Sequence, residues 1–305
     1  MALGTMYFGW KDSQESSLER LDQYTEAGGN FVDTANVYTR REAEGLDLYG
    51  KDFDKFRDGA SERLIGDWMR EKKNRSDIIL ATKVGFAYPG ITIGTSRKQI
   101  IEECEKSLKR LKTDYIDIYY LHMDDKSTPI EESLGALTEL VKSGKVRAVG
   151  ASNFTAERLR EADSVARREG FVRFSCVQNK GTHLTPRADA DYGRQAPLDR
   201  DVLSLAKELQ ITPIAYSPLA KGYYANRSKG LADCYVSPEN EEKIKRLDSL
   251  SRQMGVSQVQ LVYAYLLASS PSILPIVASS TAEQFREALG ALDISLENEI
   301  FHSLM

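Results

Sequence analysis

The sequence predicts an α/β fold of the (β/α)8 TIM-barrel class, as a single domain over residues 1–305 with long loops on the carboxyl-terminal face. Short apolar runs rich in β-branched residues alternate with amphipathic helical stretches from end to end. Eight such units in 305 residues take about 38 residues each, close to the ~30 or more of a βαβ module. No Gly-x-Gly-x-x-Gly motif follows the first run and no composition break divides the chain, which favours a closed barrel over a doubly wound sheet.

Eight runs have the length and residue types of strands. Several, such as "DIILATKV" and "YIDIYYLH", are almost continuously apolar, which is typical of strands covered on both faces of a parallel sheet. The expected strands are 3–8, 30–35, 77–84, 115–122, 146–152, 174–178, 212–217 and 273–278.

Between the strands, apolar residues recur with the helical period, and residues typical of helix ends flank them. The stretch "PIEESLGALTELVKSG" has Pro129 at its first turn, acids next and Gly144 as its stop. The expected helices are 16–28, 61–73, 96–112, 129–144, 155–170, 199–210, 239–254, 257–269 and 281–292. Three long connections, 39–60, 181–198 and 222–238, each follow a strand, which assigns them to the face where barrel active sites are built.

Composition excludes several classes of protein. The net charge of −4 and a pI of about 5.6, with no long basic run, argue against a nucleic-acid binder. Cys104, Cys176 and Cys234 lie far apart without a Cys-x-x-Cys spacing, which argues against a disulfide framework and favours a reducing cytoplasm. Nothing approaches an 18-residue apolar span, and "MALGTMYFGW" lacks a signal peptide's charged start. We therefore expect a cytoplasmic protein without a membrane partner.

Four polar side chains converge on one end of the predicted barrel. Asp33, Lys83 and His122 lie at or near the carboxyl ends of three strands, and Tyr38 follows the strand that ends near Asp33. Taken singly, Asp33 is typical of a cap or turn, Tyr38 of a packing aromatic and His122 of a core histidine. Lys83 is harder to dismiss, because lysine is almost never fully buried unless it is paired. Their convergence favours a functional site.

Such a set can transfer a proton to or from an oxygen. A tyrosine hydroxyl serves as a proton donor at neutral pH if a nearby ammonium favours its phenolate form. Lys83 would supply that charge, Asp33 would pair with Lys83, and His122 would orient the reacting oxygen. The set needs neither a nucleophile nor a metal, but it lacks an electron source, which indicates a cofactor.

The motifs D-T-A-x-x-Y, A-T-K and L-H, followed by "GKVRAVGASNF", resemble the aldo-keto reductase superfamily over nearly the whole chain. The resemblance implies that Asp33, Tyr38, Lys83 and His122 form a catalytic tetrad. It also implies that NADPH, or less often NADH, lies extended across the barrel mouth without a Rossmann fold. Hydride would pass from the nicotinamide to a carbonyl carbon while the tyrosine protonates the oxygen.

The resemblance also implies which residues contact the cofactor. Ser152, Asn153 and Gln178 would hold the nicotinamide carboxamide, and Tyr216 would stack on the ring. The pyrophosphate and adenosine contacts, with those after the first strand, would come from Ser217, Leu219, Gly222, Ser279, Ser280, Gln284, Glu287, Gly4, Thr5, Met6 and Asp33. Hydroxyls and backbone N–H groups at a helix N-terminus suit an anion, which agrees with the adenosine segment.

Three features depart from the family pattern. Many NADPH-specific members place Lys or Arg where this chain has Ala278 and Gln284, although Arg227 lies where some members, including the potassium-channel β subunits, have a phosphate-contacting Lys. NADPH is therefore expected, with NADH left open. Family members usually open with a short β-hairpin, whereas this sequence starts directly at "ALGTM", so the hairpin is expected to be absent or replaced by another element. An insertion within 39–60 adds Tyr49, Phe53 and Phe56.

The expected function is reduction of an aldehyde or ketone, or the reverse oxidation of an alcohol, on a small molecule that could be sugar-derived. Tyr7, Phe8 and Trp10, with Tyr38 and His122, are the expected substrate pocket. One alternative is a dinucleotide-binding sensor similar to the channel β subunits, with the insertion as a docking surface. Another is a zinc hydrolase using "HMDD" (122–125), disfavoured because His183 and His302 do not lie at strand ends. An oligomer is left open.

Overall fold

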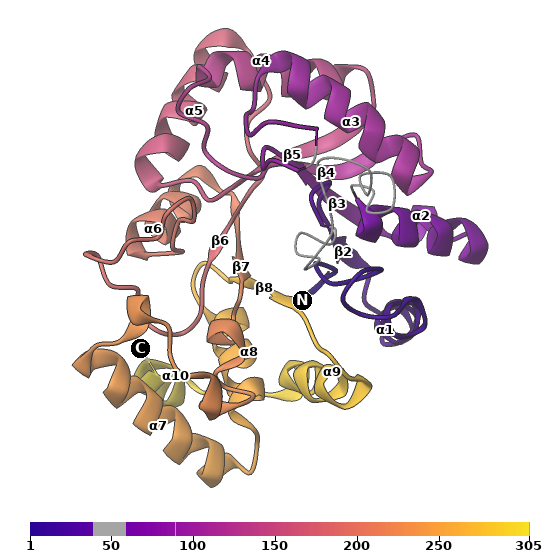
Figure 1. Cartoon of the computed structure of the whole chain (residues 1–305). Coiled ribbons are helices and arrows are strands. Elements are labelled where there is room, and N and C mark those ends of the chain that lie inside the picture. The colour runs from indigo at the N-terminus through magenta and orange to yellow at the C-terminus, as the bar shows by residue number, and fades with distance from the viewer. Residues whose placement is uncertain (39–58, 89, 305) are drawn as a thin grey trace. The chain divides into compact units, whose positions relative to one another are not determined.

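The computed structural model describes residues 1–38, 59–88 and 90–304. Within them, eight strands alternate with helices and follow one another in sequence order as a closed barrel (Figure 1). The predicted (β/α)8 class is therefore confirmed. The chain separates into two compact units, a first of Ala2–Ser152 with Glu157–Ser175, and a second of Met1, Asn153–Ala156 and Cys176–Met305. That residues 1–305 make one domain stays a prediction.

The first unit contains five parallel strands. These strands are β1 (Ala2–Gly4), β2 (Phe31–Asp33), β3 (Ile79–Val84), β4 (Ile116–Leu121) and β5 (Val146–Ser152). Val84, the last residue of β3, pairs with Leu121, the last residue of β4. Both side chains are fully buried, in keeping with the apolar runs that predicted the strands.

The helices of the first unit follow its strands and lie along their outer side in Figure 1, coloured indigo to pink. They are α1 (Gln14–Glu26), α2 (Ala60–Lys72), η2 (Arg75–Asp77), α3 (Arg97–Leu111), α4 (Ile130–Lys142) and α5 (Ala156–Glu169). Ser13 and Ser96 cap α1 and α3 by accepting a hydrogen bond from a backbone N–H of the first turn. The start of α1 was predicted two residues late, at Ser16, because Ser13 is the serine that caps it.

Helices α2 and α3 pack at backbone distance. A Cβ atom added to Gly66 of α2 would lie 2.5 Å from the carbonyl oxygen of Arg110 on α3. Beside this contact, the guanidinium of Arg110 donates to the buried carboxylate of Glu62 at 2.5 Å, and the hydroxyl of Thr82 on β3 donates to the same carboxylate. Glu62 thus joins α2 to both α3 and β3, and fixes the start of α2, which follows the loop that carries Tyr38.

The second unit contains three parallel strands and the remaining helices. They are β6 (Cys176–Lys180), β7 (Thr212–Tyr216), β8 (Leu274–Val277), α6 (Arg200–Leu209), α7 (Pro238–Met254), α8 (Gln258–Ala268), α9 (Ala282–Leu289), α10 (Asn298–Leu304), and the short 3-10 turns η3 (Ala220–Gly222), η4 (Arg227–Lys229), η5 (Asp233–Tyr235) and η6 (Gly290–Asp293). Helix α8 is apolar on most sides and buries six residues, while a capping box at Ser257 and Gln260 fixes its start.

Most predicted strands are longer than the observed ones by one or two residues at an end, and two differ by more. The strand predicted over 3–8 stops at Gly4, because Phe8 donates its backbone N–H to the Thr5 carbonyl and the chain turns there. The strand predicted over 174–178 runs instead from Cys176 to Lys180, since the buried side chain of Asn179 finds hydrogen-bond partners that the sequence did not reveal. The helix α10 and the 3-10 turns were not predicted.

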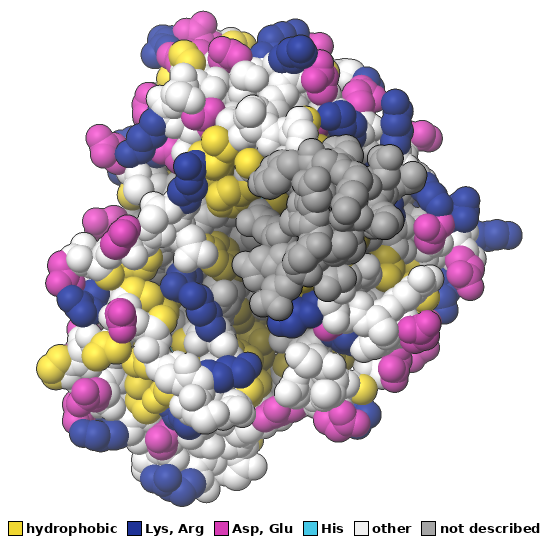
Figure 2. All heavy atoms as spheres, viewed as in Figure 1, with side chains coloured by type: hydrophobic (Ala, Val, Ile, Leu, Met, Phe, Trp, Pro, Cys, Tyr) yellow, Lys and Arg dark blue, Asp and Glu magenta, His cyan; other side chains and the backbone are white. Residues whose placement is uncertain are grey.

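The surface carries both charge signs. On the face shown in Figure 2, Lys and Arg side chains are interspersed with Asp and Glu, as the net charge of −4 leads one to expect. Among the described residues, we find no helix with the length and apolarity needed to cross a membrane. The aromatic residues Tyr49, Phe53 and Phe56 of the insertion lie outside the described residues.

Candidate active site

Three strand ends of the first unit bring the four predicted residues together. Asp33 is the last residue of β2, Lys83 is the last but one of β3, and His122 directly follows β4. Tyr38 lies in the loop after β2. Asp33, Lys83 and His122 are buried, with Lys83 fully inaccessible, whereas Tyr38 is half-buried. This juxtaposition is the one that the ends of parallel strands predict.

Lys83 uses its ammonium to connect the site. Its Nζ donates to Asp33 Oδ1 at 2.5 Å, to the backbone carbonyl of Thr34 at 2.8 Å and to the Tyr38 hydroxyl at 3.3 Å. Burial by itself would lower the pKa of Lys83, but attraction to Asp33 and to Tyr38 outweighs it, so the pKa lies above its ordinary value. Lys83 therefore carries a full positive charge, in contact with the tyrosine, at neutral pH.

His122 lies beside the tyrosine. The two rings are 5.9 Å apart and nearly perpendicular, and the Phe86 ring packs edge-on against the imidazole at 4.6 Å. The backbone N–H of His122 donates to the Val84 carbonyl at 2.7 Å, which extends the β3–β4 pairing by one residue. The imidazole and the Tyr38 ring are thus direct neighbours.

Backbone hydrogen bonds hold the segment from Thr34 to Tyr38. Thr34 and Asn36 donate their backbone N–H groups to the carbonyls of Ala81 and Lys83, at 2.9 and 3.3 Å. Beyond them, Ser61 at the start of α2 donates its backbone N–H to the Tyr38 carbonyl at 3.2 Å. Tyr38 is therefore held between β3 on one side and the first turn of α2 on the other.

Residues near β1 adjoin Asp33. The backbone of Gly4 pairs with Asp33, and the Thr5 hydroxyl donates to the Asp33 carbonyl at 2.9 Å. Met6 is half-exposed. Of the three aromatic residues predicted to line a substrate pocket, Phe8 is buried with Arg20 over its ring, whereas Tyr7 is exposed and packs at 5.6 Å against Trp10, which donates to the Met6 carbonyl. Of these three aromatic residues, Phe8 is therefore buried, whereas Tyr7 and Trp10 are accessible to solvent.

In the second unit, Asn153 and Tyr216 form a second polar arrangement. The Tyr216 hydroxyl donates to Asn153 Oδ1 at 2.7 Å, and Asn153 adopts a left-handed backbone with φ of 62°. Its N–H donates to the Asn179 side chain at 2.8 Å and to the Gln178 carbonyl at 3.2 Å. Asn179 is fully buried and was missed by the sequence reasoning; a polar residue continuing an apolar run was the only signal. Ser152, the residue before Asn153, ends β5.

The turn after β7 is compact. Ser217, Ala220, Lys221 and Gly222 all have positive φ, between 48° and 87°. A non-glycine residue in this region is uncommon, and a run of such residues curls the backbone tightly around Leu219, which directly precedes η3. The predicted pyrophosphate segment is therefore a tight, irregular turn.

Arg227 has two partners and one unused donor group. Its Nη2 donates to Asp248 and to Gln258, at 2.6 Å each, and the guanidinium lies over the Tyr223 ring at 4.3 Å. Nη1 is buried and has no hydrogen-bond partner among the described residues. A buried donor without an acceptor costs free energy, so this atom is well suited to meet an anionic group of a ligand.

The predicted adenosine segment precedes α9. Thr281 caps that helix by accepting from the Gln284 backbone N–H at 3.2 Å, and Gln284 Oε1 accepts from the Ser280 N–H at 3.0 Å. Ser279 lies just before this turn, and Glu287 is half-buried on the helix. The segment places hydroxyl and amide groups around a helix start.

The acids of "HMDD" have ordinary protein partners. The Asp125 carboxylate accepts from Thr95, Ser127 and Thr128, and Asp124 accepts from Arg158 at 2.8 Å. Within the described ranges, no group of three or more His, Cys, Asp or Glu side chains is placed to hold a metal ion.

Comparison with known proteins finds relatives over the whole chain. The model of the Aldo/keto reductase family matches residues 1–304. Norsolorinic acid reductase stcV of Emericella nidulans is 29% identical, covering 100% of this chain and 76% of that protein. The uncharacterized oxidoreductase YrpG of Bacillus subtilis is 30% identical, covering 100% of this chain and 90% of its own. Norsolorinic acid reductase A of Aspergillus parasiticus is 28% identical, over 98% and 75% respectively.

Proposed function

Because this chain belongs to the Aldo/keto reductase family, we propose that it is an NAD(P)H-dependent oxidoreductase that reduces an aldehyde or ketone, or oxidises the alcohol in reverse, with Tyr38 as the proton donor. The observation that carries the proposal is the Lys83 ammonium, which contacts both the Asp33 carboxylate and the Tyr38 hydroxyl. A buried ammonium in contact with a phenol is an arrangement for stabilising a phenolate.

Each of the four residues has a separate task in this proposal. Tyr38 gives its proton to the oxygen of the carbonyl group as that oxygen gains negative charge. Lys83 stabilises the phenolate that is left, and Asp33 keeps the ammonium from being buried without a counter-ion. His122, close to Tyr38, donates to or accepts from the same oxygen and sets its direction.

The cofactor residues fit a nicotinamide dinucleotide. Bound NAD(P)H would supply the hydride for the carbonyl carbon. In the second unit, Asn153 and Tyr216 suit the nicotinamide end, and the turn from Ser217 to Gly222 suits the pyrophosphate. We favour NADPH over NADH because the buried Nη1 of Arg227 lacks an acceptor, which a 2′-phosphate would provide.

For the substrate we propose only a broad class, a small molecule with an aldehyde or ketone group. Long polar and aromatic loops led us to expect a sugar-derived carbonyl, while several fungal relatives are named for the reduction of norsolorinic acid. A substrate panel should therefore include aldehydes, ketones, sugars and norsolorinic acid.

The first experiment titrates the purified protein with NADPH and NADH separately, following nicotinamide fluorescence, and then assays the panel. We expect tighter binding of NADPH and oxidation of NADPH by at least one carbonyl compound. The Tyr38→Phe variant should lose about 10² to 10⁴ in kcat, the usual contribution of a general acid, and keep its affinity for NADPH. Tyr115→Phe, which removes another hydroxyl before the start of β4, is the matched control and should keep full activity.

Each alternative outcome has a clear meaning. A Tyr38→Phe variant with full activity would remove the proposed acid. Tight dinucleotide binding without turnover of any carbonyl in the panel would favour the sensor function. Failure of the folded protein to bind either dinucleotide would reject both.

A further inference from the structure

Asn36 lies in the loop between Asp33 and Tyr38 and is fully buried. Its backbone N–H donates to the Lys83 carbonyl, and its side-chain Nδ2 donates to Glu103 Oε2 at 2.9 Å. Glu103 belongs to α3 and is 67 residues away in the sequence. The loop that carries the proposed proton donor is therefore attached to a carboxylate on a neighbouring helix.

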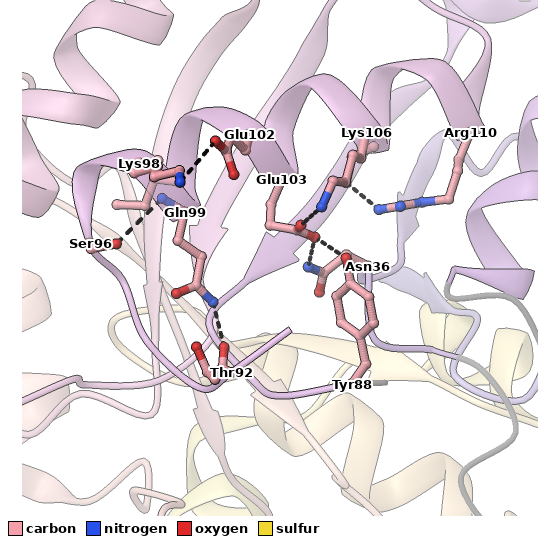
Figure 3. Close-up of polar contacts among 12 residues, drawn as sticks. Asn36, Tyr88, Thr92, Ser96, Lys98, Gln99, Glu102, Glu103, Lys106 and Arg110 are labelled. Atoms are coloured by element: carbon pink, nitrogen blue, oxygen red, sulfur yellow. Dashed lines mark hydrogen bonds and ion pairs between the residues drawn. The ribbon is translucent and has the colours of Figure 1, made fainter. Parts of the chain in front are cut away.

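Glu103 is buried, with 1% of its surface exposed, and its carboxylate accepts from three side chains (Figure 3). Oε2 accepts from Asn36 and from the Tyr88 hydroxyl, the latter at 2.5 Å, and Oε1 accepts from the Lys106 ammonium at 2.8 Å. A buried carboxylate is costly unless it is paired and hydrogen-bonded, and these donors offset that cost. Three donors of different kinds also hold the carboxylate in a single orientation.

The two donors to Oε2 come from loops that lead to two different groups of the active site. Asn36 lies two residues before Tyr38. Tyr88 lies two residues after Phe86, whose ring packs on the His122 imidazole at 4.6 Å. One oxygen atom of Glu103 therefore ties the loop of Tyr38 to the loop that supports His122.

We propose that Glu103 is a positioning residue, which fixes the Tyr38 hydroxyl relative to the His122 imidazole by holding Asn36 and Tyr88 on one oxygen atom. The inference rests on the proposed proton transfer by Tyr38. Glu103 is joined to Asn36 and Tyr88, so it acts on Tyr38 and His122 through the two loops. Proton transfer is sensitive to such placement, because a misplacement of about 1 Å can cost about 10²-fold in rate.

The proposal is tested by exchanging donor and acceptor. Asn36→Asp sets two carboxylates at hydrogen-bond distance, so one must take up a proton and the contact weakens as the pH rises. We expect kcat to fall by about 10- to 100-fold at pH about 8, with a smaller loss at lower pH and little change in KM. In the double variant Asn36→Asp/Glu103→Gln, the glutamine Nε2 takes the place of Oε2, and its two N–H groups donate to the new carboxylate and to the Tyr88 hydroxyl oxygen. Both loops stay joined to one atom, so kcat should return to within about threefold of the parent without the added pH dependence.

Two further variants separate positioning from folding. Lys106→Met removes the partly exposed donor to Oε1 and leaves both donors to Oε2, so kcat should stay within about twofold of the parent. Tyr88→Phe removes one hydroxyl from a half-buried ring and should fold even if Asn36→Asp does not. It should lower kcat by about 3- to 10-fold and the melting temperature by only a few degrees, since a single hydrogen bond to a charged group is lost.

The results distinguish this inference from the proposed function. If the double variant recovers the melting temperature but not kcat, or if Tyr88→Phe and Asn36→Asp leave kcat and its pH profile unchanged, then Glu103 is only a structural residue. If Tyr38→Phe retains full activity, the proposed function fails whatever the Glu103 variants do. Loss in Tyr38→Phe together with recovery in the double variant supports both.

Discussion

Lys83 shows how one buried charge can organise a site. Its ammonium has three donors, and the acceptors are a carboxylate, a backbone carbonyl and a phenol hydroxyl. Each acceptor comes from a different position along residues 33–38. The lysine therefore fixes the conformation of that loop and also supplies a positive charge to it. Removing one of its partners should impair catalysis more than it impairs folding.

Asp33→Asn should make activity fall as the pH rises. The amide has the same shape but no charge, so burial is no longer opposed by the carboxylate and the pKa of Lys83 decreases. Above the decreased pKa the lysine is neutral and no longer stabilises the Tyr38 phenolate. We expect kcat/KM of this variant to decline at a lower pH than that of the parent, measured from about pH 5.5 to about pH 9.5.

Lys83→Met is the control for that pH profile. It has no ammonium to titrate, so its activity should be low at every pH without the new decline. A parent-like profile for Asp33→Asn would show that the carboxylate does not control the charge of Lys83.

Residue types at strand ends were predictable, but their supporting partners were not. Asp33, Lys83 and His122 follow apolar runs, so the sequence itself marks them as strand-end residues. The side chains of Asn36 and Glu103 form a hydrogen bond although 67 residues separate them in the sequence. Nothing local distinguishes Glu103 from the other acids of α3 as the buried one, because its helix presents acids at several neighbouring positions.

At the scale of elements, helix positions followed from caps and periodicity, whereas helix contacts did not. The start of α3 was marked by Ser96, and its end by basic residues before a left-handed Lys112. The close approach of α2 and α3 depends on Gly66, which in the sequence is an unremarkable glycine inside a helical pattern. An isolated glycine inside a helix by itself predicts only lower stability. That Gly66 allows close packing is evident only once the position of α3 is known.

Gly66→Ala should destabilise the protein by about 1 to 3 kcal/mol, the usual cost of overpacking. The new Cβ would lie 2.5 Å from the Arg110 carbonyl oxygen and 2.7 Å from the Leu111 carbonyl carbon, and backbone atoms cannot move aside as a side chain can. The free energy of unfolding in urea measures the change.

Gly135→Ala is the matched control, because Gly135 also lies within a helix, α4. Its new Cβ would meet only the Phe171 ring, at 3.7 Å, which is ordinary contact. Alanine there should stabilise the protein by about 0.5 to 1 kcal/mol through lower backbone entropy in the unfolded chain. Equal effects at the two positions would contradict the close helix packing.

At the scale of the molecule, the alternation of strand and helix was enough to predict the barrel class. Family membership then supports the chemistry, since the family model covers residues 1–304. What composition could not predict is how the chain as a whole responds to acid. That response depends on which titratable groups are buried, and therefore on tertiary structure.

His183 should make the protein less stable in mild acid. The imidazole is buried, and burial, with the charges of Lys243 and Arg227, lowers its pKa to about 3. In the unfolded chain the pKa is about 6.5. Between about pH 6.5 and about pH 3, the unfolded chain therefore binds a proton that the folded protein does not, so stability decreases as the pH falls through this window.

The expected size of this effect is about 1.4 kcal/mol per pH unit below about 6.5, or roughly 2 kcal/mol at pH 5. Melting temperatures at pH about 7 and about 5 measure it, and His183→Leu should show a smaller decrease between them than the parent. Leu184→Ala, which truncates the buried neighbouring residue, controls for lost packing and should lower the melting temperature equally at both pH values. If the parent and His183→Leu lose the same stability in acid, the imidazole accepts its proton within the fold and the buried, neutral state assigned to it is wrong.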